Sequence, residues 1–152
     1  MKRLIATMAA VMLAGLVSEV SAGPVEEVAQ IAAPRIQALQ DGNLDAYTAA
    51  YADNAVFQSS LSAFRIEGKQ AIRAYFEEVL RRYPTRRILP RQPAMRAYND
   101  DLVVQNGYAV LYLTDPKGQV TTVHTRSSVT WAKLGGRWQI VDQHTSRLPV
   151  AP

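Results

Sequence analysis

Two histidines provide the only imidazole groups in this 152-residue chain, and one of them stands close to a carboxylate. His144 follows Asp142 by two residues, and an imidazole paired with a carboxylate suits acid–base chemistry near neutral pH. The chain has no cysteine, whereas a zinc site normally needs three or four nitrogen, sulfur or oxygen ligands at close quarters. We therefore predict no metal site and no cofactor, and keep His144 with Asp142 as the catalytic alternative.

A guanidinium on a predicted strand is a candidate for binding a ligand. Over residues 119–133 the side chains alternate between two faces, so that Arg126 and His124 share a face. A tight turn before this strand would set Arg126 opposite Gly107 and His124 opposite Ala109. Such small residues leave room for a ligand beside the guanidinium. The alternative is that Arg126 pairs with a carboxylate or lies in solvent, because isolated polar residues on a strand often form only its wet face.

The face that His144 occupies depends on the turn before its strand. A two-residue turn at 135–136 would set His144 beside Ser127, on the opposite face from Arg126. A β-bulge would reverse this arrangement, and bulges are common near functional sites. Both alternatives stay open on the sequence.

Aromatic side chains from the helical part of the chain could complete a pocket. Tyr47 and Tyr51 are candidates to line it, and Phe57 reads as a core residue. Buried aromatics are more often core than ligand contacts. The role of the two tyrosines therefore stays open.

The elements that must position these residues follow from apolar spacing. Helical spacing predicts two helices before the first strand and a third after it. Everything beyond Pro84 alternates with period two and is broken by turn sequences, of which 115–118 is typical of a type I turn. The predicted helices are 24–41, 44–51 and the stripe from 72 to 83, and the predicted strands are 55–60, 86–99, 102–114, 119–133 and 137–146. Pro90 and Pro93 make 86–99 an irregular or edge strand. Helices followed by hairpins indicate an α+β fold, with three helices on one face of an antiparallel sheet around a cone-shaped space.

The first residues read as an export signal. Lys2 and Arg3 precede an apolar run over 4–17, and small residues at 20–22 precede a cut ahead of Gly23. We expect residues 1–22 to be a cleaved signal peptide and residues 23–152 to form one domain. The run is too short for a membrane span, so we expect a periplasmic or secreted protein without an integral membrane segment after processing.

The charge of the chain is mildly basic, at +4 overall. Six arginines fall between residues 81 and 96 without an acidic residue among them. Such a cluster could meet phosphates, but the chain has no nucleic-acid motif. We therefore predict a solvated surface and no nucleic-acid partner.

Three segments resemble a known family. Residues 41–48 (DGNLDAYT) are similar to the helix junction of the calcium/calmodulin-dependent protein kinase II association domain, and residues 68–76 (GKQAIRAYF) resemble the long helix of that family and of SnoaL-like proteins. The segment 136–146 (GRWQIVDQHTS) resembles the last strand of the association domain. The resemblance extends over nearly all of 25–152 and places the chain in the nuclear transport factor 2-like superfamily.

The resemblance implies a strongly curved sheet wrapped around a pocket, and self-assembly through that sheet. It favours Arg126, His144 and Ser146 near the pocket. The positions that match the arginines of the animal domain are Val129 and Thr145, neither of which is basic, so Arg126 would have to replace those groups. The resemblance does not imply kinase activity, because the kinase motifs are missing.

An isomerase-like member of the superfamily would need a carboxylate base at the end of the first strand. The matching residue is Ser59, which cannot abstract a proton from carbon at neutral pH without an activating base. We therefore expect an exported, self-associating domain with a pocket that binds a small polar or anionic ligand without catalysis. The alternatives are a SnoaL-like isomerase, cyclase or hydrolase, and a purely structural oligomerisation hub.

Overall fold

The computed structural model describes residues 22–149. The signal peptide expected over residues 1–22 lies outside the described residues, apart from its last residue. None of the described helices is long and apolar enough to cross a membrane.

Three helices pack on one side of the molecule: α1 (Pro24–Asp41), α2 (Leu44–Thr48) and α3 (Lys69–Arg82). Gly42 ends α1 in the left-handed region, with φ of 78°, and its N–H bonds back to the last turn. Asn43 then caps α2, because its side-chain oxygen accepts a backbone hydrogen bond from the first turn of that helix. The bounds of α1 confirm the prediction, whereas α2 ends three residues before the predicted helix.

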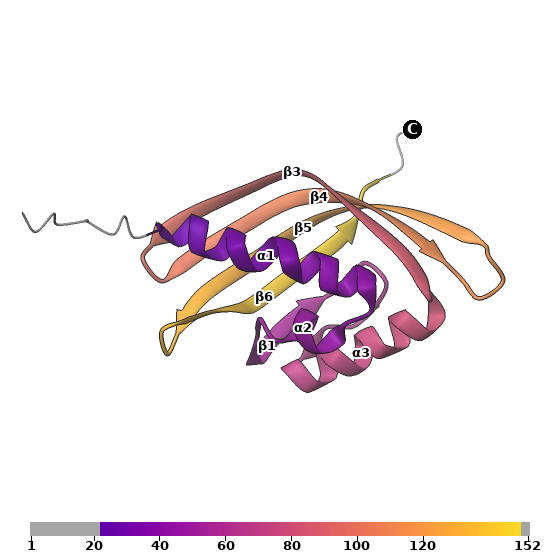
Figure 1. Ribbon diagram of the computed structural model, residues 1–152, viewed down its shortest axis with the longest axis horizontal. Helices are drawn as coiled ribbons and strands as arrows, with labels where there is room; N and C mark the ends of the chain where they lie inside the picture. Colours follow the sequence, from indigo (N-terminus) through magenta and orange to yellow (C-terminus); the bar gives the residue numbers. More distant parts are fainter. Residues whose placement is uncertain (1–21, 150–152) are drawn as a thin grey trace, which may run out of the picture.

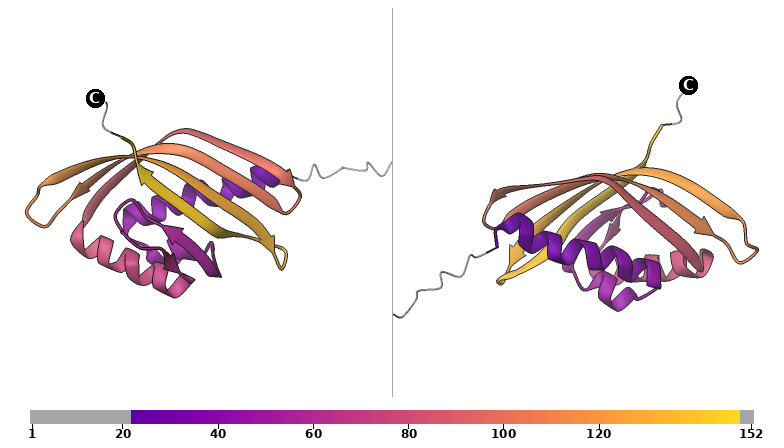
Figure 2. Two further views of the ribbon diagram at one scale, coloured as in Figure 1. Left: turned by 180° about the vertical axis from the view of Figure 1, so that it is seen from behind. Right: turned by 45° about the horizontal axis from the view of Figure 1, so that its top comes forward.

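Six strands form one sheet in the order β2-β1-β6-β5-β4-β3. Strands β3 to β6 make an antiparallel meander, and β1 joins β6 in parallel. The sheet is strongly curved and arches over the helices, with α1 lying across its concave face and α3 near one end (Figures 1 and 2). The strands are β1 (Tyr51–Gln58), β2 (Ile66–Glu67), β3 (Thr85–Asn99), β4 (Leu102–Thr114), β5 (Val120–Leu134) and β6 (Arg137–Arg147). The α+β architecture is confirmed.

Strand β3 lies at the edge of the sheet and is irregular, as its prolines predict. Its register against β4 shifts between Arg91 and Ala94, and Gln92 there has a φ of 46°. Gly107 on β4 faces this bulge, where an added Cβ would lie 3.5 Å from the backbone of β3. A bulge bends the strand and increases its twist, so this position contributes to the curvature of the sheet.

The turn before β5 differs from the prediction by one residue. Asp115–Gly118 does form a turn, with the Gly118 N–H donating to the Asp115 carbonyl at 3.0 Å. Gln119 also belongs to the loop, since β5 begins only at Val120. The Gln119 carbonyl oxygen accepts a hydrogen bond from the Asp115 N–H and closes the loop. Thr114 therefore pairs with Val120. The predicted pairing of Thr114 with Gln119 was wrong by one position.

This shift changes the neighbours of two candidate residues. Arg126 lies opposite Tyr108, and His124 lies opposite Val110. The predicted neighbours, Gly107 and Ala109, were therefore wrong, and the residue opposite Arg126 is a tyrosine instead of a glycine. The extra loop residue is the physical reason, since register in a hairpin follows from loop length.

A second irregularity decides the face of His144. The register between β5 and β6 shifts between Thr130 and Trp131, so His144 lies opposite Ser128. Of the two alternatives for the turn, the bulge is the one found. His144 and Arg126 consequently lie on the same face of the sheet.

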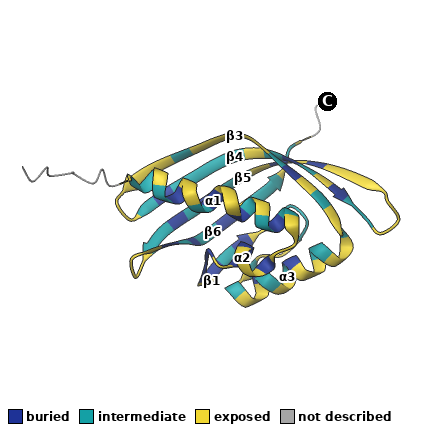
Figure 3. Ribbon diagram, viewed as in Figure 1, coloured by how far each residue is buried: buried dark blue, intermediate teal, exposed yellow. Residues whose placement is uncertain are grey.

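The core fills the space between the concave face and the helices. Its largest fully buried side chains include Trp131, Tyr47, Tyr51, Ile72 and Ile140. Figure 3 shows buried and exposed residues alternating along α1 and along the strands beneath it. Phe57 belongs to this core, as predicted.

Candidate functional site

A cavity of about 130 Å³ lies between the concave face of the sheet and the helices. Residues of α1, α2, α3, the end of β1 and strands β3 to β6 line it. Most of its wall is apolar, with Leu39, Phe57, Phe76, Ile88 and Leu111 among its members. Its volume is close to the roughly 150 Å³ of an engineered apolar cavity that binds benzene. The space therefore suits a ligand of about that size.

Polar groups gather on the sheet side of this cavity. Thr125 and Ser127 from β5 and Gln143 and Thr145 from β6 line it. The cavity lining formed by residues 22–149 contains no aspartate, glutamate or histidine. The polar groups can form hydrogen bonds, but none of these four side chains is a general base at neutral pH.

Ser59 lies at the cavity and is hydrogen-bonded to a tyrosine. Its hydroxyl oxygen is 2.5 Å from the hydroxyl oxygen of Tyr75 on α3, and both residues line the cavity. Burial raises the pKa of Tyr75 above its ordinary value, although the hydrogen bond with Ser59 acts in the opposite direction. Tyr75 therefore stays a neutral phenol, and this pair does not supply the proton-abstracting base that an isomerase would need.

Arg35 is the main residue that the sequence reasoning missed. It lies in the middle of α1 and is only 6% exposed. Its guanidinium lies 4.1 Å from the ring centre of Tyr47 and 4.7 Å from that of Tyr51. Among the described residues, no carboxylate forms a salt bridge with it. A signal was present in the sequence, because residue 35 continues the buried 28-32-35-39 pattern of the helix.

A hydrogen-bond network holds Arg35 against the cavity wall. Its Nε donates to the carbonyl of Tyr47, at 3.2 Å. Its Nη2 donates to the hydroxyl of Tyr51 at 2.6 Å and to Oε1 of Gln143 at 3.0 Å. The Tyr51 hydroxyl donates in turn to the same Oε1, at 2.8 Å. The network therefore ties α1 to β1 and β6, directly behind the polar side of the cavity.

Burial keeps Tyr51 in its neutral form. It raises the pKa of Tyr51 well above the ordinary value, although the nearby charge of Arg35 acts in the opposite direction. Tyr51 is thus a donor to Gln143 and not an anion that could pair with Arg35. Tyr47 lines the cavity itself, whereas Tyr51 lies behind it in the network.

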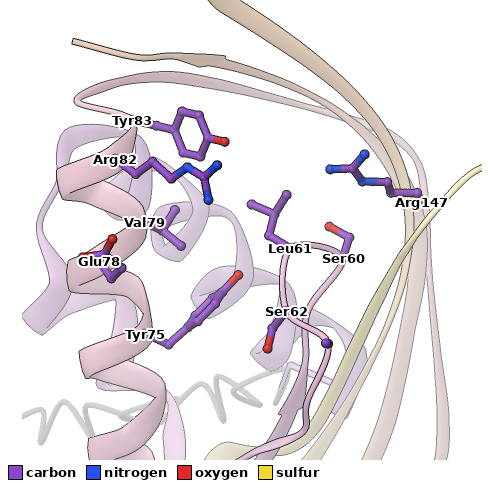
Figure 4. A pocket seen from close by; sticks show the side chains of 10 residues that line it. Ser60, Leu61, Ser62, Tyr75, Glu78, Val79, Arg82, Tyr83 and Arg147 are labelled. Atoms are coloured by element: carbon purple, nitrogen blue, oxygen red, sulfur yellow. The ribbon is translucent and has the colours of Figure 1, made fainter.

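An outer depression of about 440 Å³ adjoins the cavity. The two share Ser60, Leu61, Tyr75 and Val79, so we call this depression the vestibule. In Figure 4 the guanidinium groups of Arg82, from α3, and Arg147, from the end of β6, point toward each other across its opening.

One carboxylate, that of Glu78, also lines the vestibule. Its two oxygens accept hydrogen bonds from Arg81, at 2.5 and 2.7 Å. The charges of Arg82 and Arg147 are thus left to face the opening.

A third arginine of this region has a structural role. Arg86 lines the cavity, but its guanidinium donates to four backbone carbonyls. Two of these, Leu39 and Gln40, belong to the last turn of α1. Burial lowers the pKa of Arg86 from its ordinary value. Because its N–H groups already donate to these backbone carbonyls, Arg86 has few hydrogen-bond donors left for a ligand.

The residues expected to bind a ligand from β5 and β6 lie on the outer face of the sheet. Arg126, His144 and Ser146 line a depression there, together with Tyr108. The Nε of Arg126 donates to the hydroxyl of Ser146 at 3.1 Å. His124 is exposed on the same strand as Arg126. These residues therefore lie on the opposite face of the sheet from the internal cavity. Arg126 alternates with Thr125 and Ser127, which line the cavity, and the bulge places His144 on the face of Arg126.

The residues of the catalytic alternative also lie outside the cavity. Neither Asp142 nor His144 is among the residues that line it, and His144 is exposed. The two positions that match arginines of the animal domain face inward: Thr145 lines the cavity, and Val129 is buried in the core. Within residues 22–149, no group of three or more histidine, aspartate or glutamate side chains is placed to hold a metal ion.

Solved structures similar to this one share its architecture. A protein from Xanthomonas campestris named for the calcium/calmodulin-dependent protein kinase II association domain is 27% identical and has a TM-score of 0.74, over 83% of this chain and 89% of that chain. A nuclear transport factor 2-like protein of unknown function from Pseudomonas putida is 24% identical, with a TM-score of 0.72 over 80% of this chain and 84% of that one.

A more distant structure shows the same fold. A Novosphingobium aromaticivorans protein named for scytalone dehydratase has a TM-score of 0.73 at 9% identity, over 81% of this chain and 83% of that chain. The identity is too low to carry more than the architecture, which is the nuclear transport factor 2-like cone. No curated protein sequence matches the chain.

The comparison with protein families gives one description for most of the chain. The calcium/calmodulin-dependent protein kinase II association domain family matches residues 25–149. These residues include the helices and strands that the structure describes, apart from Pro24, the first residue of α1. The chain therefore belongs to the calcium/calmodulin-dependent protein kinase II association domain family.

Proposed function

We propose that this chain is an exported, self-associating domain that binds one small polar or anionic ligand in its internal cavity without catalysing a reaction. The observation that carries the proposal is the composition of the cavity wall. It combines an apolar surface with hydroxyl and amide groups, and the lining given by the described residues lacks a carboxylate or imidazole. Such a wall suits a small organic molecule with a polar end.

The vestibule favours an anion among the possible ligands. Arg82 and Arg147 face its opening, while Glu78 is held by Arg81. Charges of one sign at an opening raise the local concentration of ions of the opposite sign. A purely structural hub would need neither the open cavity nor these charges.

Ligand binding in the cavity is tested with a series of small cyclopentyl compounds on the chain beginning at Gly23. Methyl resonances of Leu39, Ile88 and Leu111 report on the cavity wall, and we expect them to shift on addition of cyclopentanecarboxylate. The variant Ala109→Leu, which narrows the cavity, should lose these shifts. The variant Arg126→Ala, on the outer face, should retain them. If no compound of the series shifts the three methyls, the cavity is not a binding site.

Self-association is the second part of the proposal. The family is named for association, and the outer face of β4 exposes Tyr108 and Tyr112, at 44% and 36%. Exposed aromatic side chains on a sheet face are typical of an interface. Light scattering at micromolar concentration should give a multiple of the monomer mass, and Tyr108→Glu should reduce it. A wild-type monomer would remove self-association from the proposal.

Export is the third part, and it rests on the charged and apolar pattern of residues 2–22. The full chain should be recovered from the periplasm of a Gram-negative host with its amino terminus at Gly23. Intact-mass measurement of the recovered protein checks this. Full-length protein retained in the cytoplasm would contradict it.

A further inference from the structure

Gln143 lines the cavity, and its side-chain amide is held in one orientation. A guanidinium can only donate hydrogen bonds, so the atom of Gln143 that faces Arg35 must be the carbonyl oxygen Oε1. Tyr51 is neutral and donates to the same oxygen. Two donors, from α1 and β1, thus fix the amide and prevent it from turning over.

Fixing Oε1 leaves the amide nitrogen as the free end of Gln143. No hydrogen bond among the described residues uses Nε2, since both bonds of this side chain are made by Oε1. No fully buried side-chain nitrogen or oxygen in that part of the chain lacks a partner. Nε2 therefore faces open space, and the space that Gln143 lines is the cavity. The cavity wall presents an N–H donor at this point.

We propose that the Arg35–Tyr51–Gln143 network makes the cavity selective for ligands that carry a hydrogen-bond acceptor, a carbonyl or carboxylate oxygen on a small apolar skeleton. This inference rests on the proposed binding function and names its ligand class. A ligand with an acceptor completes the bonding of Nε2. A ligand with only donors leaves two N–H groups facing each other without an acceptor, which carries the full penalty of desolvation.

The position of the network explains why the selection is for acceptors. The charge of Arg35 has no carboxylate partner among the described residues, so it favours electron-rich atoms on the ligand. Its own Nη2 is used up by Tyr51 and Gln143. Arg35 is therefore a positioning residue, and Gln143 is the group that would contact the ligand.

Four probes with one skeleton test the inference by NMR titration: cyclopentanone, cyclopentanecarboxylate, cyclopentylamine and cyclopentane. The two acceptors should bind at least about tenfold more tightly than cyclopentane and cyclopentylamine, the factor expected for one hydrogen bond to a buried amide. Cyclopentanone and cyclopentane are both uncharged, so the difference between their affinities reports the hydrogen bond alone. The side-chain amide resonances of Gln143 should shift with the acceptors and not with cyclopentane.

The variant Gln143→Glu provides the sharpest test. One carboxylate oxygen would accept from Arg35 and Tyr51, and the other would face the cavity as an acceptor. The preference should then invert, with cyclopentylamine binding more tightly than cyclopentanecarboxylate by about tenfold or more. Gln139→Glu, on the same strand but outside the cavity lining, should keep the wild-type preference. If Gln143→Glu does not fold, Gln143→Met should bind all four probes with similar affinity.

The outcomes separate this inference from the proposed function. Equal binding of the four probes to the wild-type protein, with cavity methyl shifts for each, would overturn acceptor selection and leave cavity binding intact. Absence of binding by every probe would overturn both. An unchanged preference in Gln143→Glu would also exclude Gln143 as the selecting group.

Discussion

Oε2 of Glu27, in the first turn of α1, accepts hydrogen bonds from the indole Nε1 of Trp138 at 2.5 Å and from Nζ of Lys133 at 2.8 Å. These contacts join residues more than 100 positions apart and fasten the start of α1 to the β5–β6 hairpin. The hydrogen bond from Lys133, followed by that from Trp138, lowers the pKa of Glu27. One side chain thus links the helix layer to the sheet in a pH-dependent way.

The first prediction follows from this carboxylate. A lowered pKa in the folded state means that Glu27 stabilises the fold above the ordinary carboxyl pKa, and that this contribution disappears as the pH falls through the folded-state pKa. The difference in the free energy of unfolding between wild type and Glu27→Gln should be largest near neutral pH and should disappear as the pH falls through the lowered, folded-state pKa of Glu27. Urea unfolding at a series of pH values measures it.

A neighbouring residue supplies the control for Glu27. Glu26 lies in the same first turn and is exposed, so Glu26→Gln removes the same charge from the helix start without the Lys133 and Trp138 contacts. If Glu26→Gln and Glu27→Gln show the same pH dependence, the contacts of Glu27 are not its cause.

The second prediction concerns the buried guanidinium of Arg35. Arg35→Met keeps an apolar chain of similar length but removes three hydrogen bonds and two contacts with tyrosine rings. We expect the free energy of unfolding to fall by about 2 kcal/mol, since release of the buried charge offsets part of the loss. Arg65→Met is the matched control, because Arg65 is exposed and its ion pair with Glu67 contributes about 0–1 kcal/mol. Equal effects of the two variants in urea unfolding would contradict the structural role of Arg35.

The third prediction concerns the end of α1. Gly42 has a φ of 78°, and a Cβ added there would lie 3.1 Å from Nη2 of Arg86. Gly42→Ala should lower the free energy of unfolding by about 1 kcal/mol, because a side chain disfavours this backbone conformation. Gly42→Asn should cost less in backbone conformation, since asparagine adopts it more readily. Thermal unfolding of both variants checks the order, and an alanine variant as stable as wild type would contradict it.

The fourth prediction concerns the vestibule. The double variant Arg82→Gln and Arg147→Gln should slow the association of cyclopentanecarboxylate and weaken the dependence of that rate on salt, because two charges that attract the anion are lost. Dissociation should change little, as neither side chain lines the cavity. Line-shape NMR at low and high ionic strength measures both rates. Arg65→Gln, elsewhere on the surface, serves as the control, and an association rate independent of the two arginines would remove them from the path of the ligand.

The order and type of most elements were determined by the sequence alone. The apolar spacing over 24–41 predicted α1 with its observed bounds, and alternation predicted β4 over 102–114. These elements follow from local periodicity, which each segment carries in itself. The short strand β2 and the parallel pairing of β1 with β6 were not predicted, because both depend on partners distant in the chain.

The tertiary structure decided which polar residues face the cavity. One additional loop residue before β5 changed the neighbours of Arg126, and one bulge between β5 and β6 set the face of His144, because side chains on a strand change face with every single position. Gln143 lines the cavity instead, and its side chain is held by Arg35 of α1, which lies 108 residues earlier in the chain. No local pattern encodes that contact, because it exists only once the helix and the last strand are packed together.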